Sequence, residues 1–284
     1  LIQAAAYRDR GVQHAICDNV VTPYVAAHVV RDNAACQIGK GTHFALVRLS
    51  KHLRDYFREY GSEGYVLKAD IRKYFPFIDH EVLRNQWARS RLDGGIKELL
   101  FRIIDSYATP ADNPDIPGDG RPRGLPMGNQ TSQQFAVFYL DPLDRMIKER
   151  WGIKYYSRYM DDMIVIHPDR EFLKCLLVAM EEKAAELRLE FNRKTQITPL
   201  KNGIDYLGWH FYLSPNGAVR RRLRTQAKKR IIRNLKKLRH DYGRGAVGLE
   251  KVGRVMASYK GHLIHGNTHG FRKSHFSRLN FVRD

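Results

Sequence analysis

The sequence feature that most constrains the fold is a pair of adjacent aspartates, Asp161 and Asp162, between two short apolar segments. Residues 155–159 precede the pair and residues 163–166 follow it, which predicts two strands joined by a very short turn. Two carboxylates at such a turn repel each other unless a cation lies close to both. The alternative interpretation is a solvated turn, because aspartate is common in turns.

A second apolar segment, residues 65–70, also ends in an acid, Asp70. If this strand lies beside the hairpin, three carboxylates converge at one edge of a sheet. Such a hard-oxygen site suits two Mg²⁺ ions, with Mn²⁺ as a substitute. Two ions roughly 3.5 to 4 Å apart can activate an attacking oxygen and stabilise a leaving one in phosphoryl transfer. This chemistry can either build or cut nucleic acid.

The charge distribution predicts a polyanionic partner. The 284 residues carry a formal net charge of +19, and residues 217–284 hold 19 Lys or Arg but 3 Asp or Glu. One end of the chain therefore carries the electrostatic footprint of nucleic-acid binding. Binding through phosphates should weaken steeply with salt and show little base preference. The candidate nucleic-acid-binding residues are Arg220, Arg221, Arg222, Arg224, Lys228, Lys229, Arg233, Lys236 and Lys237.

Strands and helices mix along the first part of the chain without regular alternation, which favours an α+β fold. Residues 225–242 and 249–265 have helical spacing and predict a basic, all-helical C-terminal module. No segment approaches the apolar length of a membrane-spanning helix, so no membrane partner is expected. Cys17, Cys36 and Cys175 are too few and scattered for a disulfide framework, and we interpret them as buried thiols of a cytoplasmic protein. The start at Leu1 suggests that an N-terminal segment is missing.

Three motifs around the aspartates resemble those of reverse transcriptases. Asp70 with residues 71–75 resembles the first catalytic motif of the family, and residues 159–162 resemble the third. Residues 124–128 with Ser132 and Gln133 resemble the second. The resemblance implies that Asp70, Asp161 and Asp162 bind the metal ions.

Two further motifs follow in the family order, so that the resemblance covers nearly the whole chain. Asn192 and Lys194 resemble the motif whose lysine protonates the pyrophosphate leaving group. The hairpin that grips the primer end is matched by Tyr206, Leu207, Gly208 and Trp209. The resemblance implies a right-hand polymerase: fingers in residues 1–64, a palm with inserted fingers elements in residues 65–216, and a helical thumb in residues 217–284.

The resemblance also implies a nucleotide site formed by Lys40, Arg48, Ile71, Phe75, Met127, Gly128 and Gln133. An aromatic ring at Phe75 can lie beneath the sugar of the incoming nucleotide and clash with a 2′-hydroxyl, which favours deoxynucleotides. The alternative is a core phenylalanine. Lys40 lies on a glycine-rich turn and can neutralise phosphates, although a solvated surface lysine is its rival interpretation.

Met127 before Gly128, and Gln133 after Ser132, resemble the motif of diversity-generating retroelements and allied bacterial lineages. Replacing an amide by a thioether near the nascent base pair removes a polar constraint on its geometry, which favours misincorporation. Met127 filling an apolar gap is the alternative. A bacterial or phage-encoded enzyme of phage defence or of the group II intron type remains open, with an accessory protein or a structured noncoding RNA as partner.

The expected activity is RNA-directed DNA polymerisation, with template RNA, a DNA primer or cDNA, and dNTPs as partners. A vestigial polymerase-like RNA-binding scaffold is the alternative of another class. It explains the basic C-terminal part but gives no reason to keep three acids, an aromatic gate and Lys194 together. A metal-dependent nuclease is the third interpretation, and it lacks any motif beyond the acids.

Overall fold

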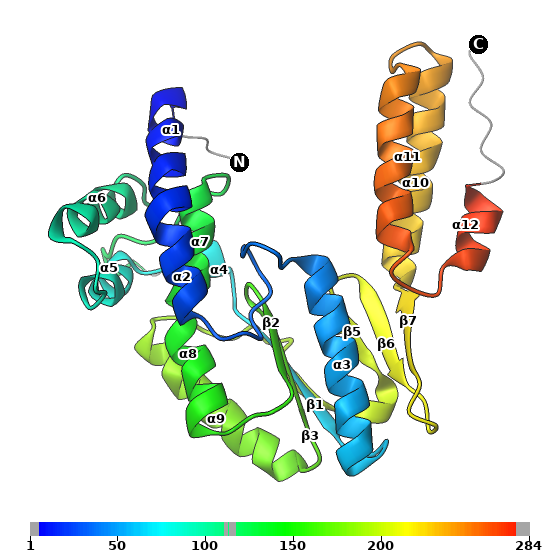
Figure 1. Ribbon diagram of the computed structural model, residues 1–284, viewed down its shortest axis with the longest axis horizontal. Helices are drawn as coiled ribbons and strands as arrows, with labels where there is room; N and C mark the ends of the chain where they lie inside the picture. The colour runs from blue at the N-terminus through cyan, green and yellow to red at the C-terminus, as the bar shows by residue number, and fades with distance from the viewer. Residues whose placement is uncertain (1–5, 111–112, 114–117, 277–284) are drawn as a thin grey trace. The chain divides into compact units, whose positions relative to one another are not determined.

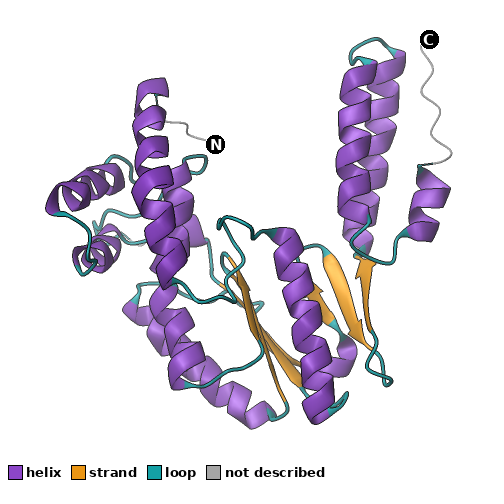
Figure 2. Cartoon of the chain, in the orientation of Figure 1, coloured by secondary structure: helices purple, strands orange, loops and turns teal. Residues whose placement is uncertain are grey.

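The protein has a mixed α+β fold with antiparallel strands, as predicted from the sequence (Figure 1, Figure 2). The computed structural model describes residues 6–110, 113 and 118–276. The chain forms two compact units. Unit 1 contains Leu1–Leu49 with Gly64–Thr198, and unit 2 contains Ser50–Glu63 with Pro199–Asp284. Helix α3 (Thr42–Tyr60) contributes its first part to unit 1 and its second part to unit 2.

A four-stranded sheet with the order β2-β3-β1-β4 forms the centre of unit 1. The strands are β1 (Tyr65–Asp70), β2 (Tyr156–Tyr159), β3 (Asp162–His167) and β4 (Gln196–Pro199). Strand β3 runs antiparallel to both β1 and β2. Its four central residues are all buried, since both of its faces are covered. The predicted hairpin and the predicted strand ending in Asp70 are therefore confirmed.

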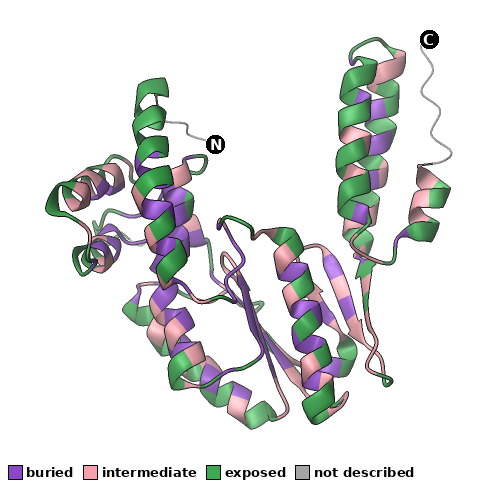
Figure 3. Ribbon diagram, viewed as in Figure 1, coloured by how far each residue is buried: buried purple, intermediate pink, exposed green. Residues whose placement is uncertain are grey.

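Helices cover this sheet and supply most of its core (Figure 3). Helix α9 (Arg170–Glu186) packs against β1 and β3, and the Asp169 carboxylate caps it by accepting hydrogen bonds from the Glu171 and Phe172 amides. Helix α7 (Gln130–Tyr139) is buried on nearly every side. The remaining helical segments of the unit are α1 (Tyr7–Ile16), η1 (Cys17–Val21), α2 (Thr22–His28), α4 (Tyr74–Phe77), α5 (His80–Ala88), α6 (Gly94–Asp105), α8 (Asp141–Arg145) and η2 (Met146–Arg150).

Capping explains two helix starts. The Asp79 carboxylate accepts a hydrogen bond from the Val82 amide, so α5 begins at His80. Helix α6 begins at Gly94 because Asp93 caps it by accepting from the Gly95 amide. The π-helical turn η1 joins α1 to α2.

Unit 2 contains a three-stranded antiparallel sheet followed by helices. The elements are η3 (Leu200–Asn202), β5 (Ile204–Tyr206), β6 (Trp209–Leu213), β7 (Val219–Leu223), α10 (Thr225–Gly243), α11 (Leu249–Leu263) and α12 (His269–His275). Gly266 packs so closely on Trp209 that a Cβ there would lie 2.1 Å from the indole ring.

The prediction of an all-helical module from residue 217 is wrong for its first residues. Val219–Leu223 forms β7, which pairs antiparallel with β6. The physical reason is alternation: Val219, Arg221 and Leu223 are more buried than Arg220 and Arg222 between them, which is the period of a strand. The helices that follow are confirmed.

The structure also bears on two further predictions, which concern membrane-spanning helices and the burial of the cysteines. No helix in the described part of the chain has the length and apolar character needed to span a membrane. Cys17 is buried as predicted, but Cys36 is only partly buried and Cys175 is exposed on α9, so the expectation of buried thiols is wrong for these two. A cysteine's burial depends on how its segment packs in the fold, which its spacing from other cysteines does not reveal.

Candidate active site

The three aspartates meet at one end of the unit 1 sheet. Asp70 is the last residue of β1, Asp162 is the first residue of β3, and the strand register makes them direct cross-strand partners. Such partners have Cβ atoms about 4.5–5.5 Å apart. Tyr159 pairs with Asp162, so Met160 and Asp161 form a two-residue turn between β2 and β3. The sheet therefore brings together residues that are 92 positions apart in the sequence.

Burial and mutual repulsion make these carboxylates hard to ionise. Burial, together with the charges of Asp70 and Asp161, raises the pKa of Asp162 to about 7, although Lys68 opposes the shift. The pKa of Asp161 is raised by burial and by the charge of Asp70. The pKa of Asp70 is raised by burial, against the opposing effects of Lys68, Asn192 and Lys194. A positive charge close to the three carboxylates would therefore stabilise their ionised forms.

The donor set fits a divalent cation, although the side chains do not yet enclose one. Within residues 6–110, 113 and 118–276, no group of three or more His, Cys, Asp or Glu side chains forms a ready metal site. However, Oδ1 of Asp162 is buried without a hydrogen-bond partner. An unsatisfied carboxylate oxygen beside two further carboxylates is the hard-oxygen environment that Mg²⁺ prefers.

The sequence interpretation missed Lys68, which shares a sheet face with Asp70 because the two are two residues apart on β1. Its Nζ lies 3.7 Å from Oδ1 of Asp162, a weak ion pair between partly exposed side chains. Strand alternation around Asp70 could have revealed this residue. Lys68 places one positive charge beside the acidic cluster.

The segment containing Asn192 and Lys194 lies against Asp70. The Asn192 amide nitrogen donates to the Asp70 carbonyl at 2.7 Å, and Nδ2 of Asn192 donates to the Asp70 carboxylate at 3.3 Å. The Lys194 amide donates to Oδ1 of Asn192 at 3.1 Å. The exposed Lys194 side chain is one of the charges that lower the pKa of Asp70. Its proton-donor role stays a prediction.

A buried ion pair stabilises the turn between β2 and β3. Arg158 and Asp144 are both fully buried, and the guanidinium donates to both carboxylate oxygens at distances between 2.6 and 2.9 Å. Tyr156 donates its hydroxyl to the same carboxylate at 2.6 Å. Arg158 also donates to the carbonyls of Val137 and Met160. Because its polar groups find partners, this network can be rigid as well as buried.

The Met160 carbonyl matters because Met160 adopts a left-handed conformation, with φ of 55°. A side chain other than glycine is disfavoured there by roughly 1–2 kcal/mol. Nη1 of Arg158 holds the carbonyl of Met160 at 2.9 Å. Sequence reasoning missed Arg158, since its partner Asp144 lies on α8 and no local pattern connects them.

The surroundings of Phe75 agree in part with a sugar gate and in part with a core phenylalanine. Its ring is partly exposed, packs against the core of unit 1 and meets the Tyr74 ring edge-on at 5.8 Å. Its carbonyl accepts from the Leu125 amide at 3.0 Å, which joins the first motif to the second. By contrast, Ile71 is 1% exposed, so its predicted nucleotide contact receives no support from its side chain.

The second motif is exposed where nucleotide contact is predicted. Met127 is 52% exposed, and Gly128 and Gln133 are also exposed. The alternative in which Met127 fills an apolar gap is therefore wrong. Oε1 of Gln133 accepts from Sγ of Cys36 at 3.5 Å, so this motif touches the segment that leads to Lys40.

Both predicted phosphate-binding cations of the fingers are engaged within the protein. Arg48 pairs with the buried Asp32 carboxylate at 2.6 Å, and Lys148 binds its other oxygen at 3.0 Å. Lys40 donates from Nζ to the carbonyls of Arg31 and Asn33. Lys40 is thus not a solvated surface lysine, and phosphate binding by either residue stays a prediction.

The predicted primer grip combines a turn with core residues in unit 2. Tyr206 pairs with Trp209 across β5 and β6, and Leu207 and Gly208 form the turn between them, both with positive φ. Such a turn matches the twist of a hairpin. The two aromatic residues are 1% and 0% exposed, so only the turn offers a surface for contact.

The predicted nucleic-acid-binding residues form a cationic surface on unit 2. The buried residues Ile231, Leu235 and Leu238 define the inner face of α10. The exposed residues are Arg220, Arg222, Lys229, Arg233, Lys236 and Lys237, whereas Arg221, Arg224 and Lys228 are partly buried. Burial, and the nearby Arg54, lower the pKa of Arg221. Arg224 pairs with Asp205 at 3.2 Å.

The sheet, its acidic edge and the helices around them define a polymerase domain. The profile of the family described as "Reverse transcriptase (RNA-dependent DNA polymerase)" matches residues 12–211. Since this match covers more than half of the chain, the protein belongs to the reverse transcriptase family. No curated protein matches the chain.

Solved structures with a similar fold include telomerases. Apo telomerase from Candida tropicalis has a TM-score of 0.51 and 13% identity, with 82% of this chain and 43% of that chain covered. Telomerase from Candida tropicalis in complex with the TWJ fragment of telomeric RNA has a TM-score of 0.51 and 14% identity, with 82% and 40% covered. At such identities the likeness shows the fold alone. The chain spans less than half the length of these telomerases.

Proposed function

We propose that this protein is an RNA-directed DNA polymerase that extends a DNA primer on an RNA template. The observation that carries the proposal is the pairing of Asp70 with Asp162 across β1 and β3, with Asp161 in the adjoining turn. Membership of the reverse transcriptase family supports it. The cationic surface of unit 2 would bind the phosphates of a nucleic-acid duplex.

In this proposal Asp70, Asp161 and Asp162 hold two Mg²⁺ ions, which would supply the positive charge that activates the primer hydroxyl and stabilises the leaving pyrophosphate. The unsatisfied Oδ1 of Asp162 and the raised pKa values of the cluster favour this assignment. Lys194, exposed beside Asp70, would donate a proton to the leaving group.

We further propose that synthesis is error-prone and belongs to a diversity-generating retroelement. The exposed thioether of Met127 supports this, because it offers no hydrogen bond to a nascent base pair beside it. A phage-defence or group II intron role is the alternative. In each of these roles, an accessory protein or a structured RNA would bind the enzyme to form the active complex.

One assay tests the proposal. Purified protein receives a primed RNA template, labelled dNTPs and Mg²⁺, and we expect primer extension. Binding without extension would instead indicate a vestigial scaffold, and cleavage would indicate a nuclease. Sequencing the cDNA then tests the biological role: errors concentrated opposite template adenines support diversity generation, whereas a faithful product contradicts it.

Replacing Phe75 by valine tests the sugar gate. We expect ribonucleotide incorporation relative to deoxynucleotide incorporation to rise about tenfold or more, since the smaller side chain leaves room for a 2′-hydroxyl. The measurement is single-nucleotide extension with dNTP and rNTP in parallel. Phe101→Val is the matched control, since Phe101 is also partly buried but lies on α6. Equal discrimination in Phe75→Val and in the wild type would show that Phe75 is a packing residue.

A further inference from the structure

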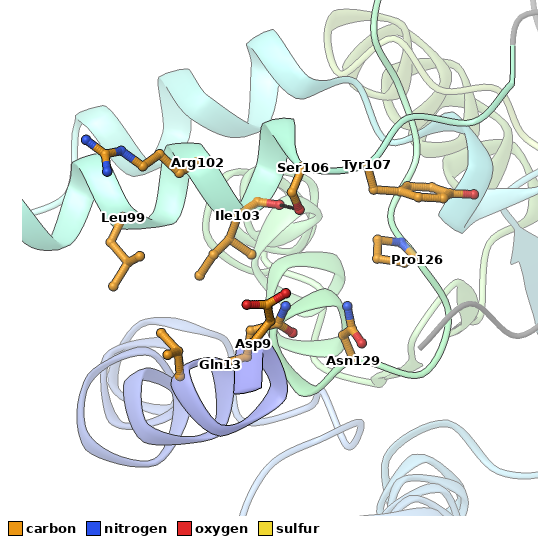
Figure 4. Close-up of a pocket in the computed structure, with 10 residues that line it drawn as sticks. Asp9, Gln13, Leu99, Arg102, Ile103, Ser106, Tyr107, Pro126 and Asn129 are labelled. Atoms are coloured by element: carbon orange, nitrogen blue, oxygen red, sulfur yellow. Dashed lines mark hydrogen bonds between the residues drawn. The ribbon is translucent and has the colours of Figure 1, made fainter. Parts of the chain in front are cut away.

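A cavity of about 410 Å³ lies in unit 1 between α1, α6 and the start of α7 (Figure 4). Asp9 and Gln13 of α1 line one side, Ile103 of α6 and the following Ser106 line another, and Asn129 lies where α7 begins. Its size falls within the usual range for small-molecule pockets. None of the roles described above uses these residues.

Asn129 is the first indication that this cavity binds a ligand. Asparagine is among the best helix N-caps, yet Asn129 makes no side-chain capping bond to α7. Its side chain points into the cavity, the residue is 6% exposed, and its Oδ1 is buried without a hydrogen-bond partner. Nearby Gln13, in contrast, accepts from the Thr131 hydroxyl at 3.0 Å. A buried amide without a partner is costly unless something else binds it.

The chemistry of the walls favours a planar heterocycle that carries no negative charge. Val12, Leu99, Ile103 and Pro126 form apolar walls, and Tyr107 adds an aromatic ring. Among the described residues that line the cavity, Arg102 is the one cation, and it pairs with Glu98 at 2.5 Å. These lining residues therefore offer no unpaired positive charge for a phosphate. An amide beside apolar and aromatic walls suits a nucleobase, whose edge takes paired hydrogen bonds and whose faces stack.

The cavity is formed in part by the chain segment that also contributes to the proposed nucleotide site. Pro126 and Asn129 line it, and between them are Met127 and Gly128 of the proposed nucleotide site. The preceding Leu125 is hydrogen-bonded to Phe75, the proposed sugar gate. The cavity and the proposed nucleotide site thus share one short segment of chain.

We propose that this cavity binds an unpaired base of the template strand, just ahead of the base pair being formed. The inference rests on the proposed function, since it needs a template to be present. The chain would hold the base by stacking on Tyr107 and by hydrogen bonds to the Asn129 amide.

The test uses the full chain and a DNA-primed RNA template with 2-aminopurine at the first, second or third unpaired template position, in separate duplexes. We expect binding of the wild type to change the fluorescence of one of these probes. Val12→Trp fills the cavity and should abolish that change and weaken binding of the overhanging template about tenfold. Asn129→Leu should weaken binding of the overhanging template about fivefold. Binding of a blunt duplex should be unaffected in both.

Val178→Trp is the matched control, because Val178 is 54% exposed on α9 and Val12 is 48% exposed on α1. A wild type that extends primers but perturbs none of the three probes would overturn the base site alone. So would Val12→Trp binding the overhanging template as tightly as Val178→Trp. A wild type that neither binds nor extends the primed template would overturn the proposed function, and the assignment of the cavity with it.

Discussion

Replacing Asp161 and Asp162 together by asparagine is expected to lower dNTP incorporation by at least about a thousandfold. Asparagine keeps the shape of the side chains but removes the two charges that would hold the cations. Because burial and mutual repulsion disfavour these charges, the same change should leave the free energy of unfolding unchanged or raised. Loss of activity with no loss of stability is the signature of a site built for a ligand.

The matched control is Glu181→Gln with Glu182→Gln, an adjacent acidic pair exposed on α9. This pair should leave incorporation within about twofold of the wild type, as is usual for exposed substitutions. Incorporation, chemical denaturation and equilibrium binding of the primed template are measured on each protein. A folded Asp161 and Asp162 double variant that still incorporates dNTPs at the normal rate would remove the proposed active site.

Replacing Arg158 by methionine is expected to lower the free energy of unfolding by about 3–5 kcal/mol. The substitution leaves the Asp144 carboxylate buried without its guanidinium partner and releases the carbonyl of Met160. Arg158→Lys keeps the charge but cannot bind Asp144, Val137 and Met160 at once. We therefore expect Arg158→Lys to fold and yet to lose turnover more than template binding.

Chemical denaturation measures the first effect, and kcat against KM for dNTP addition measures the second. Arg84→Met is the control, since Arg84 pairs with Asp105 where both side chains are about half exposed. Such a surface pair contributes about 0–1 kcal/mol. If Arg158→Met were no less stable than Arg84→Met, the network would not hold the turn.

The local parts of the site could be predicted from the sequence because they depend on short-range patterns. Short apolar segments predicted the strand that ends in Asp70 and a strand over residues 163–166, and the brevity of the turn before the latter indicated a hairpin. The two hydrogen bonds between Asn192 and Asp70, by contrast, join segments that the motif pattern alone does not place together.

The rest depends on packing between segments that carry no joint pattern. The pairing of Arg48 on α3 with Asp32 in a turn, and of Arg158 on β2 with Asp144 on α8, follows from how distant segments pack in space. Strand β7 was not predicted because four arginines in six residues indicate a charged surface, although the alternation of Val219 and Leu223 with arginine is typical of a strand. The burial of Ile71 likewise follows from the sheet rather than from its motif.

The two-residue turn between β2 and β3 also limits how this protein can be re-engineered. Inserting or deleting one residue between Tyr156 and Val165 would shift the pairing by one step and turn every following side chain of β3 to the opposite face. Asp162 would then point away from Asp70, and apolar groups would be pushed toward water. Tags, linkers or loop grafts therefore belong elsewhere, because this hairpin admits no change of length.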